Sequence, residues 1–285
     1  MSAKLELQNV SYYYGKGTAF EVKALDNVSF AVKEKSITGL IGHTGSGKST
    51  LAQLFNGLEK PTEGSVLLDG CDIWDKKYKG GRLCFRVGLV MQYPEYQLFE
   101  ETVLNDVAFG PRNKGMPEDE VKKLVADAIA FVGLSPEILT QSPFDLSGGQ
   151  KRRVAIAGIM AMQPEVLVLD EPAAGLDPSG RAEIFAGIKQ YRDNTGATVI
   201  IISHSMEDMA EYCDDIIVMH RGAVMLAGAK DSVFADSDKL VEAGLDIPQI
   251  TRTMRYLAER GLDVNAAVCT KDQAVTELIR AFKLK

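Results

Sequence analysis

A chain of 285 residues, 46% of them hydrophobic, is long enough to form one large domain and a small additional unit. Its formal net charge of −7 argues against a general surface for nucleic acid or anionic lipid, although the basic run at residues 151–153 is a local exception. The longest apolar stretch, near residues 154–162, is far short of the ~20 residues that a membrane-spanning helix needs.

Two kinds of strand pattern follow along the chain. Residues 5–10 and 28–32 alternate between apolar and polar, and with a short run at residues 65–68 they predict an antiparallel β layer. Apolar runs are each followed by a polar motif, which predicts the parallel core of a doubly wound α/β sheet with its active site at the strand ends. These runs are residues 37–41, 87–91, 166–169 and 198–202.

The motif after the first of these runs fits the phosphate-loop pattern of a glycine, four residues, and then glycine, lysine and a hydroxyl. Backbone N–H groups of such a loop face one anion at the positive end of the following helix. Lys48 would reach the β- and γ-phosphates of a nucleotide, and Ser49 would bind magnesium. A dinucleotide-binding loop does not fit, because Thr50 stands where a third glycine or alanine belongs. The predicted phosphate-binding residues are Gly42, His43, Thr44, Gly45, Ser46, Gly47, Lys48, Ser49 and Thr50.

Two adjacent carboxylates, Asp170 and Glu171, follow the apolar run at residues 166–169. Most such pairs are solvated surface groups, but this pair ends a buried strand in a chain that also carries a phosphate loop. Asp170 is therefore predicted to hold Mg²⁺ through water, and Glu171 to act as the general base toward the attacking water.

A second anion site is predicted at Leu146, Ser147, Gly148, Gly149 and Gln150, where a serine and two glycines begin a helix. It lies roughly a hundred residues after the phosphate loop. One γ-phosphate can be held by both sites only if two subunits meet head to tail.

These motifs, in this order, resemble the nucleotide-binding subunits of ABC transporters over about residues 3–230. The resemblance implies that Gln92 binds magnesium and links it to a transmembrane partner, that Asp177 communicates across the dimer, and that His204 contacts the γ-phosphate. It also implies that Tyr14 stacks on adenine, with Tyr12 as the alternative. Each of these residues also has a simpler interpretation without a functional role. Gln92 would be a loop amide, Asp177 a turn residue before Pro178, His204 a capped strand end, and the tyrosines part of an exposed strand. Ala173 departs from the threonine of many members.

A closer resemblance is to the energy-coupling factor (ECF) ATPases, through residues 92–99, 108–111 and 142–144. In that family the segment after the glutamine receives arginines from a membrane scaffold. Carried over, Glu95, and with it Glu100, would receive them; a solvated acidic loop is the alternative. ECF ATPases often work as a pair of two related chains. The sequences at residues 42–44 and 93–95 resemble those of the second chain of such a pair.

The sequence thus predicts an α/β P-loop ATPase domain of the ABC type at residues 1–231, with a helical subdomain at about 93–160 and a C-terminal helical extension at 232–285. Proline at 248 and a capping box from Thr270 to Gln273 predict two amphipathic helices in the extension. These helices pack on their own domain or hold two ATPases together.

The expected function is hydrolysis of ATP, with Mg²⁺, to power import of vitamins or transition-metal ions through a membrane scaffold. The expected partners are a second, identical or homologous ABC ATPase, a transmembrane scaffold subunit and, indirectly, a substrate-binding membrane subunit, with no nucleic acid. The four cysteines lack paired spacing and the start shows no apolar signal region, so we expect a peripheral protein on the cytoplasmic face of the membrane. Rivals are a conventional or cobalt/nickel importer, a regulatory subunit that does not hydrolyse ATP, and a soluble ABC ATPase acting on nucleic acid or ribosomes.

Overall fold

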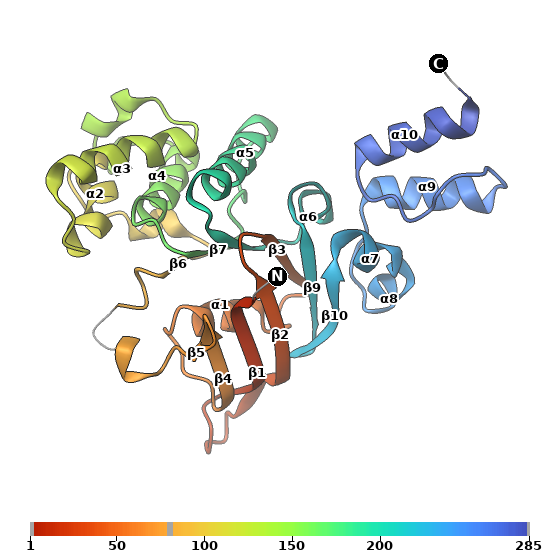
Figure 1. The fold of residues 1–285 in the computed structure, drawn as a ribbon, viewed down its shortest axis with the longest axis horizontal. Coiled ribbons are helices and arrows are strands. Elements are labelled where there is room, and N and C mark those ends of the chain that lie inside the picture. The colour runs from red at the N-terminus through yellow and green to blue at the C-terminus, as the bar shows by residue number, and fades with distance from the viewer. Residues whose placement is uncertain (1–2, 79–81, 284–285) are drawn as a thin grey trace.

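The computed structural model describes residues 3–78 and 82–283, whose strands form two sheets (Figure 1). The antiparallel sheet has the strand order β2-β1-β4-β5, and the core sheet has the order β10-β9-β3-β8-β7-β6. The strands are β1 (Ala3–Tyr14), β2 (Val22–Lys33), β3 (Ile37–Gly42), β4 (Glu63–Leu68), β5 (Cys71–Asp72), β6 (Val87–Val90), β7 (Val166–Asp170), β8 (Thr198–Ile202), β9 (Asp215–His220) and β10 (Ala223–Ala229).

The four predicted core strands are confirmed, and they pair in parallel in the order β3, β8, β7 and β6. The predicted antiparallel layer is confirmed as β1, β2 and β4. Two strands of the core sheet were not predicted: β9 pairs with β3 in parallel, and β10 pairs with β9 antiparallel. Because the parallel strands share one direction, the motifs that follow them meet at one edge of the sheet.

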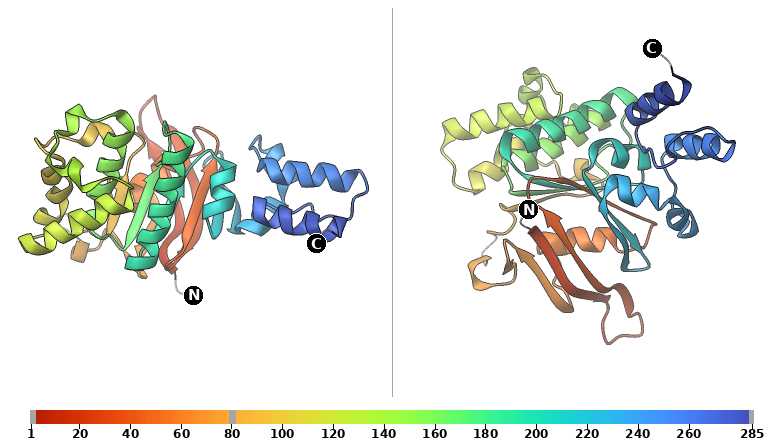
Figure 2. Two further views of the ribbon diagram at one scale, coloured as in Figure 1. Left: turned by 90° about the horizontal axis from the view of Figure 1, so that it is seen from above. Right: turned by 45° about the vertical axis from the view of Figure 1, so that its right-hand side comes forward.

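Helices and the antiparallel sheet cover the two faces of the core sheet (Figures 1 and 2). Leu167 and Leu169 belong to the main core cluster with the helices, whereas Val166 and Val168 belong to the cluster with the antiparallel sheet. Burial on both faces explains why this strand is a continuous apolar run. The helices are α1 (Lys48–Phe55), α2 (Val103–Asn113), α3 (Glu118–Phe131), α4 (Gly148–Ala161), α5 (Pro178–Thr195), α6 (Met206–Tyr212), α7 (Lys230–Ala235), α8 (Ser237–Glu242), α9 (Gln249–Glu259) and α10 (Lys271–Phe282), with 3-10 turns η1 (Lys76–Tyr78), η2 (Pro94–Gln97), η3 (Pro136–Thr140) and η4 (Pro143–Asp145).

The segment between β6 and β7 is mainly helical, as predicted, and α2, α3 and α4 gather at one end of the molecule (Figure 1). α3 and α5 approach each other closely, since a Cβ atom at Gly187 would lie only 1.6 Å from the carbonyl oxygen of Phe131. Glycine is therefore required where α5 meets the helical subdomain. None of the described helices is long and apolar enough to cross a membrane.

The C-terminal region has two parts. Val233, Phe234 and Leu240, on α7 and α8, are buried in the main core cluster. By contrast, α9 and α10 extend from the body of the molecule (Figures 1 and 2) and share a small cluster around Met254. Both predicted helices are confirmed, and the capping box at Thr270 is present. The domain boundary at residue 231 stays a prediction, although α7 and α8 pack with the first domain.

Ion pairs join the residues that precede β6 and β7, at the amino ends of the core strands and opposite the end where the motifs lie. Arg86 Nε donates to Glu165 Oε1, and Lys4 Nζ donates to Glu165 Oε2, each at 2.6 Å. The hydrogen bond from Arg86 is the largest cause that lowers the pKa of Glu165 from 4.5 to about 2.

This pKa predicts how stability depends on pH. A carboxylate with a lowered folded-state pKa stabilises the fold above its unfolded pKa, and the contribution is lost as pH falls through the folded value. We expect Glu165→Gln to unfold at lower urea concentration near neutral pH, and to lose less additional stability than the unsubstituted protein between pH 4.5 and about 2. Urea unfolding across this range measures both; equal acid sensitivity of the two proteins would contradict the role of Glu165.

Candidate functional site

The phosphate loop connects β3 to α1, as predicted, and its backbone is tightly enclosed. Gly47 is the N-cap of α1 with φ 101°. A Cβ atom there would lie 2.6 Å from Leu25 Cδ2 and 2.9 Å from the carbonyl oxygen of Ala24. Only glycine satisfies both conditions, so strand β2 helps to shape the loop. α1 ends at Phe55, and Gly57 follows with φ 75°.

Lys48 is buried within this loop. Its Nζ donates to the carbonyl oxygens of Gly42 at 2.6 Å and His43 at 2.8 Å. Burial lowers the pKa of Lys48, while the charges of Asp170 and Glu171 oppose the shift. The ammonium group is thus held inside the loop, beside two carboxylates at the start of an anion-binding helix.

Ser49 and Asp170 form a cluster of oxygen atoms next to this lysine. Ser49 Oγ donates to Asp170 Oδ2 at 3.2 Å, and burial raises the pKa of Asp170 although the serine hydrogen bond opposes it. Gln92 lines the same cleft of about 340 Å³. Hydroxyl, carboxylate and amide oxygens are ligands that Mg²⁺ accepts, so the residues present fit this ion.

Glu171 follows Asp170 in an unusual backbone conformation, with φ 53°. Its Oε1 atom is buried and makes no hydrogen bond among the described residues, and His204 Nε2 lies 3.4 Å from it. Burial is the largest cause that raises the pKa of Glu171; His204 opposes this shift and Asp170 adds to it. A desolvated carboxylate with a raised pKa is a better proton acceptor, which suits a general base.

The cleft therefore brings together many of the predicted residues that the sequence spreads over 190 positions. Its lining includes Tyr14, Thr44, Gly45, Gly47, Lys48, Ser49, Thr50, Gln92, Asp170, Glu171 and His204.

The surroundings of Tyr14 and Tyr12 differ, which distinguishes the two candidates for stacking on adenine. The Tyr14 hydroxyl lies 3.0 Å from Thr50 Oγ1, and 41% of the residue is exposed. Tyr12 is buried and donates to Glu59 Oε2 at 2.6 Å; burial is the first cause that raises its pKa to about 12. Tyr14 lines the cleft and Tyr12 does not, so Tyr14 is the better placed of the two for stacking on a base.

The predicted second anion site begins α4 and lies outside this cleft. Ser147 caps the helix and forms a capping box with Gln150, so the polar side chains fix the helix start. Leu146 is buried beneath it. No residue of 146–150 is among the described residues that line the cleft. Asp177 also caps a helix, since its side chain accepts from the N–H of Gly180 at 3.0 Å.

Arg152 is a residue that the sequence did not single out. It lies on α4, is buried, and donates to the carbonyl oxygens of Gln92 and Ala174. Its Nε is 3.6 Å from Glu95 Oε2. Glu95 is therefore turned inward rather than solvated, with only 21% of its side chain exposed. One guanidinium thus joins α4, the glutamine segment and the chain after Glu171; its only sequence signal is the middle place in a basic triplet.

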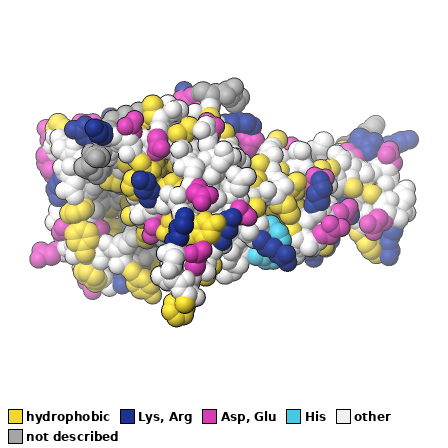
Figure 3. Space-filling view, turned by 90° about the horizontal axis from the view of Figure 1, so that it is seen from below, with side chains coloured by type: hydrophobic (Ala, Val, Ile, Leu, Met, Phe, Trp, Pro, Cys, Tyr) yellow, Lys and Arg dark blue, Asp and Glu magenta, His cyan; other side chains and the backbone are white. Residues whose placement is uncertain are grey.

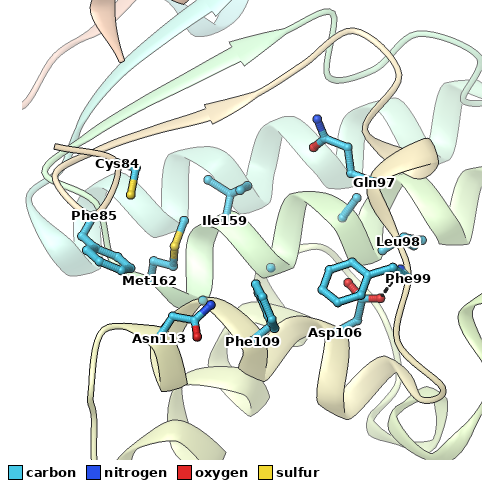
Figure 4. A pocket seen from close by; sticks show the side chains of 13 residues that line it. Cys84, Phe85, Gln97, Leu98, Phe99, Asp106, Phe109, Asn113, Ile159 and Met162 are labelled. Atoms are coloured by element: carbon cyan, nitrogen blue, oxygen red, sulfur yellow. Dashed lines mark hydrogen bonds between the residues drawn. The ribbon is translucent and has the colours of Figure 1, made fainter. Parts of the chain in front are cut away.

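An apolar groove of about 320 Å³ runs between the core and the helical subdomain (Figure 4). Phe99 and Phe109 meet edge to face in it, with ring centroids 4.9 Å apart, and both are more than two-fifths exposed. Tyr96, on η2, is 83% exposed. Figure 3 shows hydrophobic side chains gathered at this end of the molecule, while basic and acidic side chains are interspersed on the same face.

Comparisons with known proteins agree with this geometry. A family model described as "ABC transporter" matches residues 25–174. The energy-coupling factor transporter ATP-binding protein EcfA2 of Caldanaerobacter subterraneus subsp. tengcongensis is 49% identical over 279 residues, 98% of each chain. The structure of cbiO1 from Clostridium perfringens, part of the ABC transporter complex cbiONQ, has a TM-score of 0.74 and 38% identity, and the match covers 90% of this chain and 100% of that one.

A dimeric structure of the ATP-binding cassette MJ0796, in a post-hydrolysis state with ADP and Pi, is 29% identical with a TM-score of 0.70. That match covers 79% of this chain and 98% of the other. The chain therefore belongs to the ABC transporter family and, within it, to the ATP-binding proteins of energy-coupling factor transporters, which makes it an ABC-type ATPase.

Proposed function

We propose that this ATPase powers import of vitamins or transition-metal ions by hydrolysing ATP on the cytoplasmic face of the membrane. The observation that supports this most strongly is the convergence of Lys48, Asp170, Glu171 and His204 on one cleft. When bound, Mg²⁺ would supply positive charge to the phosphate oxygens, and Ser49, Gln92 and Asp170 would hold it.

In the proposed mechanism Lys48 turns from its loop carbonyls to the β- and γ-phosphates of ATP. Glu171 accepts a proton from the attacking water, and His204, whose Nε2 lies 3.4 Å from Glu171 Oε1, would contact the γ-phosphate. These groups act mainly by position and charge, because phosphoryl transfer asks little covalent chemistry of the protein.

The second half of each site is proposed to come from a second ABC ATPase, identical or homologous. The start of α4 lies away from the cleft of its own chain, so Ser147 and Gly149 would complete the partner's site while Asp177 contacts it across the dimer. The structure of the relative MJ0796 with ADP and Pi is dimeric, which supports this proposal.

We propose that the apolar groove and the Gln92–Glu95 segment receive a transmembrane scaffold subunit. Exposed aromatic rings border the groove, and contiguous apolar surface of this kind marks interaction sites. Arg152 connects this segment to α4, so a displacement at the groove would reach both anion sites. Contact with a substrate-binding membrane subunit would then be indirect, and nucleic acid is not a partner.

Affinity purification of the tagged chain from native membranes in mild detergent, with mass spectrometry and an ATPase assay, tests this function. Recovery of a second ATPase, a polytopic scaffold and small membrane proteins that bind vitamins or metals would support it. One dedicated permease would favour a conventional importer, and a cobalt or nickel permease would favour a cobalt/nickel importer. Recovery of ribosomes or DNA would overturn transport.

We further propose that α9 and α10 help to hold two ATPases together. Val275, Ile279 and Phe282 of α10 are each at least 45% exposed and lie at helical spacing. A variant that lacks α9 and α10 tests this role. Because α7, α8 and Ile247 pack in the main core, the residues to delete are those after Ile247. We expect light scattering to show less dimer without nucleotide; an unchanged dimer would contradict this role.

The aromatic ring of Tyr14 is proposed to stack on adenine. We expect Tyr14→Ala to weaken ATP binding by about 1–2 kcal/mol, as the loss of base stacking does elsewhere, and Tyr14→Phe to bind nearly as the unsubstituted protein does. Tyr12→Ala should instead lower the free energy of unfolding, because Tyr12 is buried. Titration with ATP and urea unfolding measure these effects; weaker ATP binding in Tyr12→Ala alone would reverse the assignment.

A further inference from the structure

His43 belongs to the phosphate loop, yet its ring contacts the C-terminal part of the chain. Nε2 of His43 lies 2.7 Å from the carbonyl oxygen of Ala243, 200 residues further along. A carbonyl oxygen only accepts hydrogen bonds, so Nε2 carries the proton and donates it. His43 is not among the described residues that line the cleft, which leaves its side chain free for this contact.

The segment that receives this hydrogen bond is held firmly by the domain. After α8, the N–H groups of Gly244 and Leu245 donate to the carbonyl oxygens of Val241 and Leu240 at 2.8 Å. Leu240 and Leu245 are buried in the main core cluster. Gly244 has φ 72°, and a Cβ atom there would lie 3.1 Å from His43 Nε2. Glycine at this position both ends the helix and permits the close approach.

The backbone of His43 meanwhile holds the phosphate loop itself. Its carbonyl oxygen accepts from Lys48 Nζ at 2.8 Å and from the N–H of Ser46 at 3.0 Å. One residue thus contacts the phosphate-binding lysine through its backbone and the end of α8 through its side chain.

We propose that His43 is a positioning residue that fixes the phosphate loop to residues 240–247, so that the loop is held ready for the nucleotide. This inference rests on ATP binding and not on the cargo or the membrane partner. A loop that is already ordered loses less freedom on binding, so the contact strengthens ATP binding. Because coupling between two sites is reciprocal, bound nucleotide also holds residues 240–247 more tightly.

Three substitutions of His43 separate the hydrogen bond from the bulk of the ring. The amide nitrogen of glutamine reaches about the place of Nε2, whereas that of asparagine reaches only about the place of Nδ1. We expect His43→Ala and His43→Asn to raise the Kd of a non-hydrolysable ATP analogue with Mg²⁺ roughly three- to tenfold, the range of one net hydrogen bond, and His43→Gln to stay within about twofold. Lys239→Gln, which removes an exposed ion pair on α8, is the matched control and should bind as the unsubstituted protein does.

Hydrogen exchange distinguishes the proposed role of His43 from a purely structural one, because a purely structural contact would not make exchange near Gly244 depend on bound nucleotide. The analogue is expected to slow exchange of the Gly244 and Leu245 amides in the unsubstituted protein, and this slowing is lost in His43→Ala. Gly244→Ala crowds the same contact from the other side and should weaken binding to a similar extent.

An unchanged Kd in His43→Ala, full slowing of exchange in that variant, or equal weakening in His43→Gln would overturn the proposal. Phosphate release by the unsubstituted protein is measured in parallel. Absence of turnover there would contradict the proposed function, while the binding and exchange results still decide the role of His43.

Discussion

Glu171→Gln is expected to slow ATP turnover by a factor on the order of 10²–10⁴ while ATP still binds, because a glutamine amide cannot accept the proton of the attacking water. The glutamine keeps the size of the side chain, and Lys48 Nζ donates to the carbonyl oxygens of Gly42 and His43 rather than to Glu171, so the groups that hold the phosphates stay in place. Phosphate release under saturating ATP measures turnover, and titration with labelled ATP measures binding.

Two comparisons make this result specific. Glu137→Gln changes an exposed carboxylate on η3 and should leave turnover unchanged. Burial raises the pKa of Glu171 above 4.5, so turnover should fall as pH decreases through that raised value, where the carboxylate becomes protonated. Turnover that persists in Glu171→Gln at the original rate would remove Glu171 from the role of general base.

Arg152→Gln is expected to lower the free energy of unfolding by about 3 kcal/mol, because it removes one partner of a buried charged network. The carbonyl oxygens of Gln92 and Ala174 would lose their donor, and Glu95 Oε2, which makes no hydrogen bond among the described residues, would lose its nearby cation. Urea unfolding measures the change.

The neighbouring Lys151 offers a matched control on the same helix. Lys151→Gln alters a partly exposed cation and should change the free energy of unfolding by less than about 0.5 kcal/mol. The double variant Arg152→Gln, Glu95→Gln should recover part of the loss, since the two side chains interact. Strictly additive effects would show that Glu95 and Arg152 act independently, against the network described above.

Much of the fold could be predicted because the strongest patterns are local. The apolar runs at 166–169 and 198–202 became buried parallel strands, and the capping box at Thr270 begins α10 where the sequence places it. β9 and β10 were missed, and no polar motif follows β9 that would have marked it as a core strand. Its place beside β3 depends on pairing of residues that are 177 positions apart, such as Thr38 and Asp215, which no local periodicity records.

The sequence by itself determined the class of protein, because the phosphate loop, the glycine-rich helix start and the strand-end carboxylates are each short segments whose chemistry depends on neighbouring residues. The tertiary structure alone decided how distant residues meet. It placed Tyr14 rather than Tyr12 in the cleft, turned Glu95 toward Arg152 and brought Ala243 to His43. These outcomes depend on burial and hydrogen bonding between segments up to 200 residues apart, which only the packing of the whole chain brings into contact.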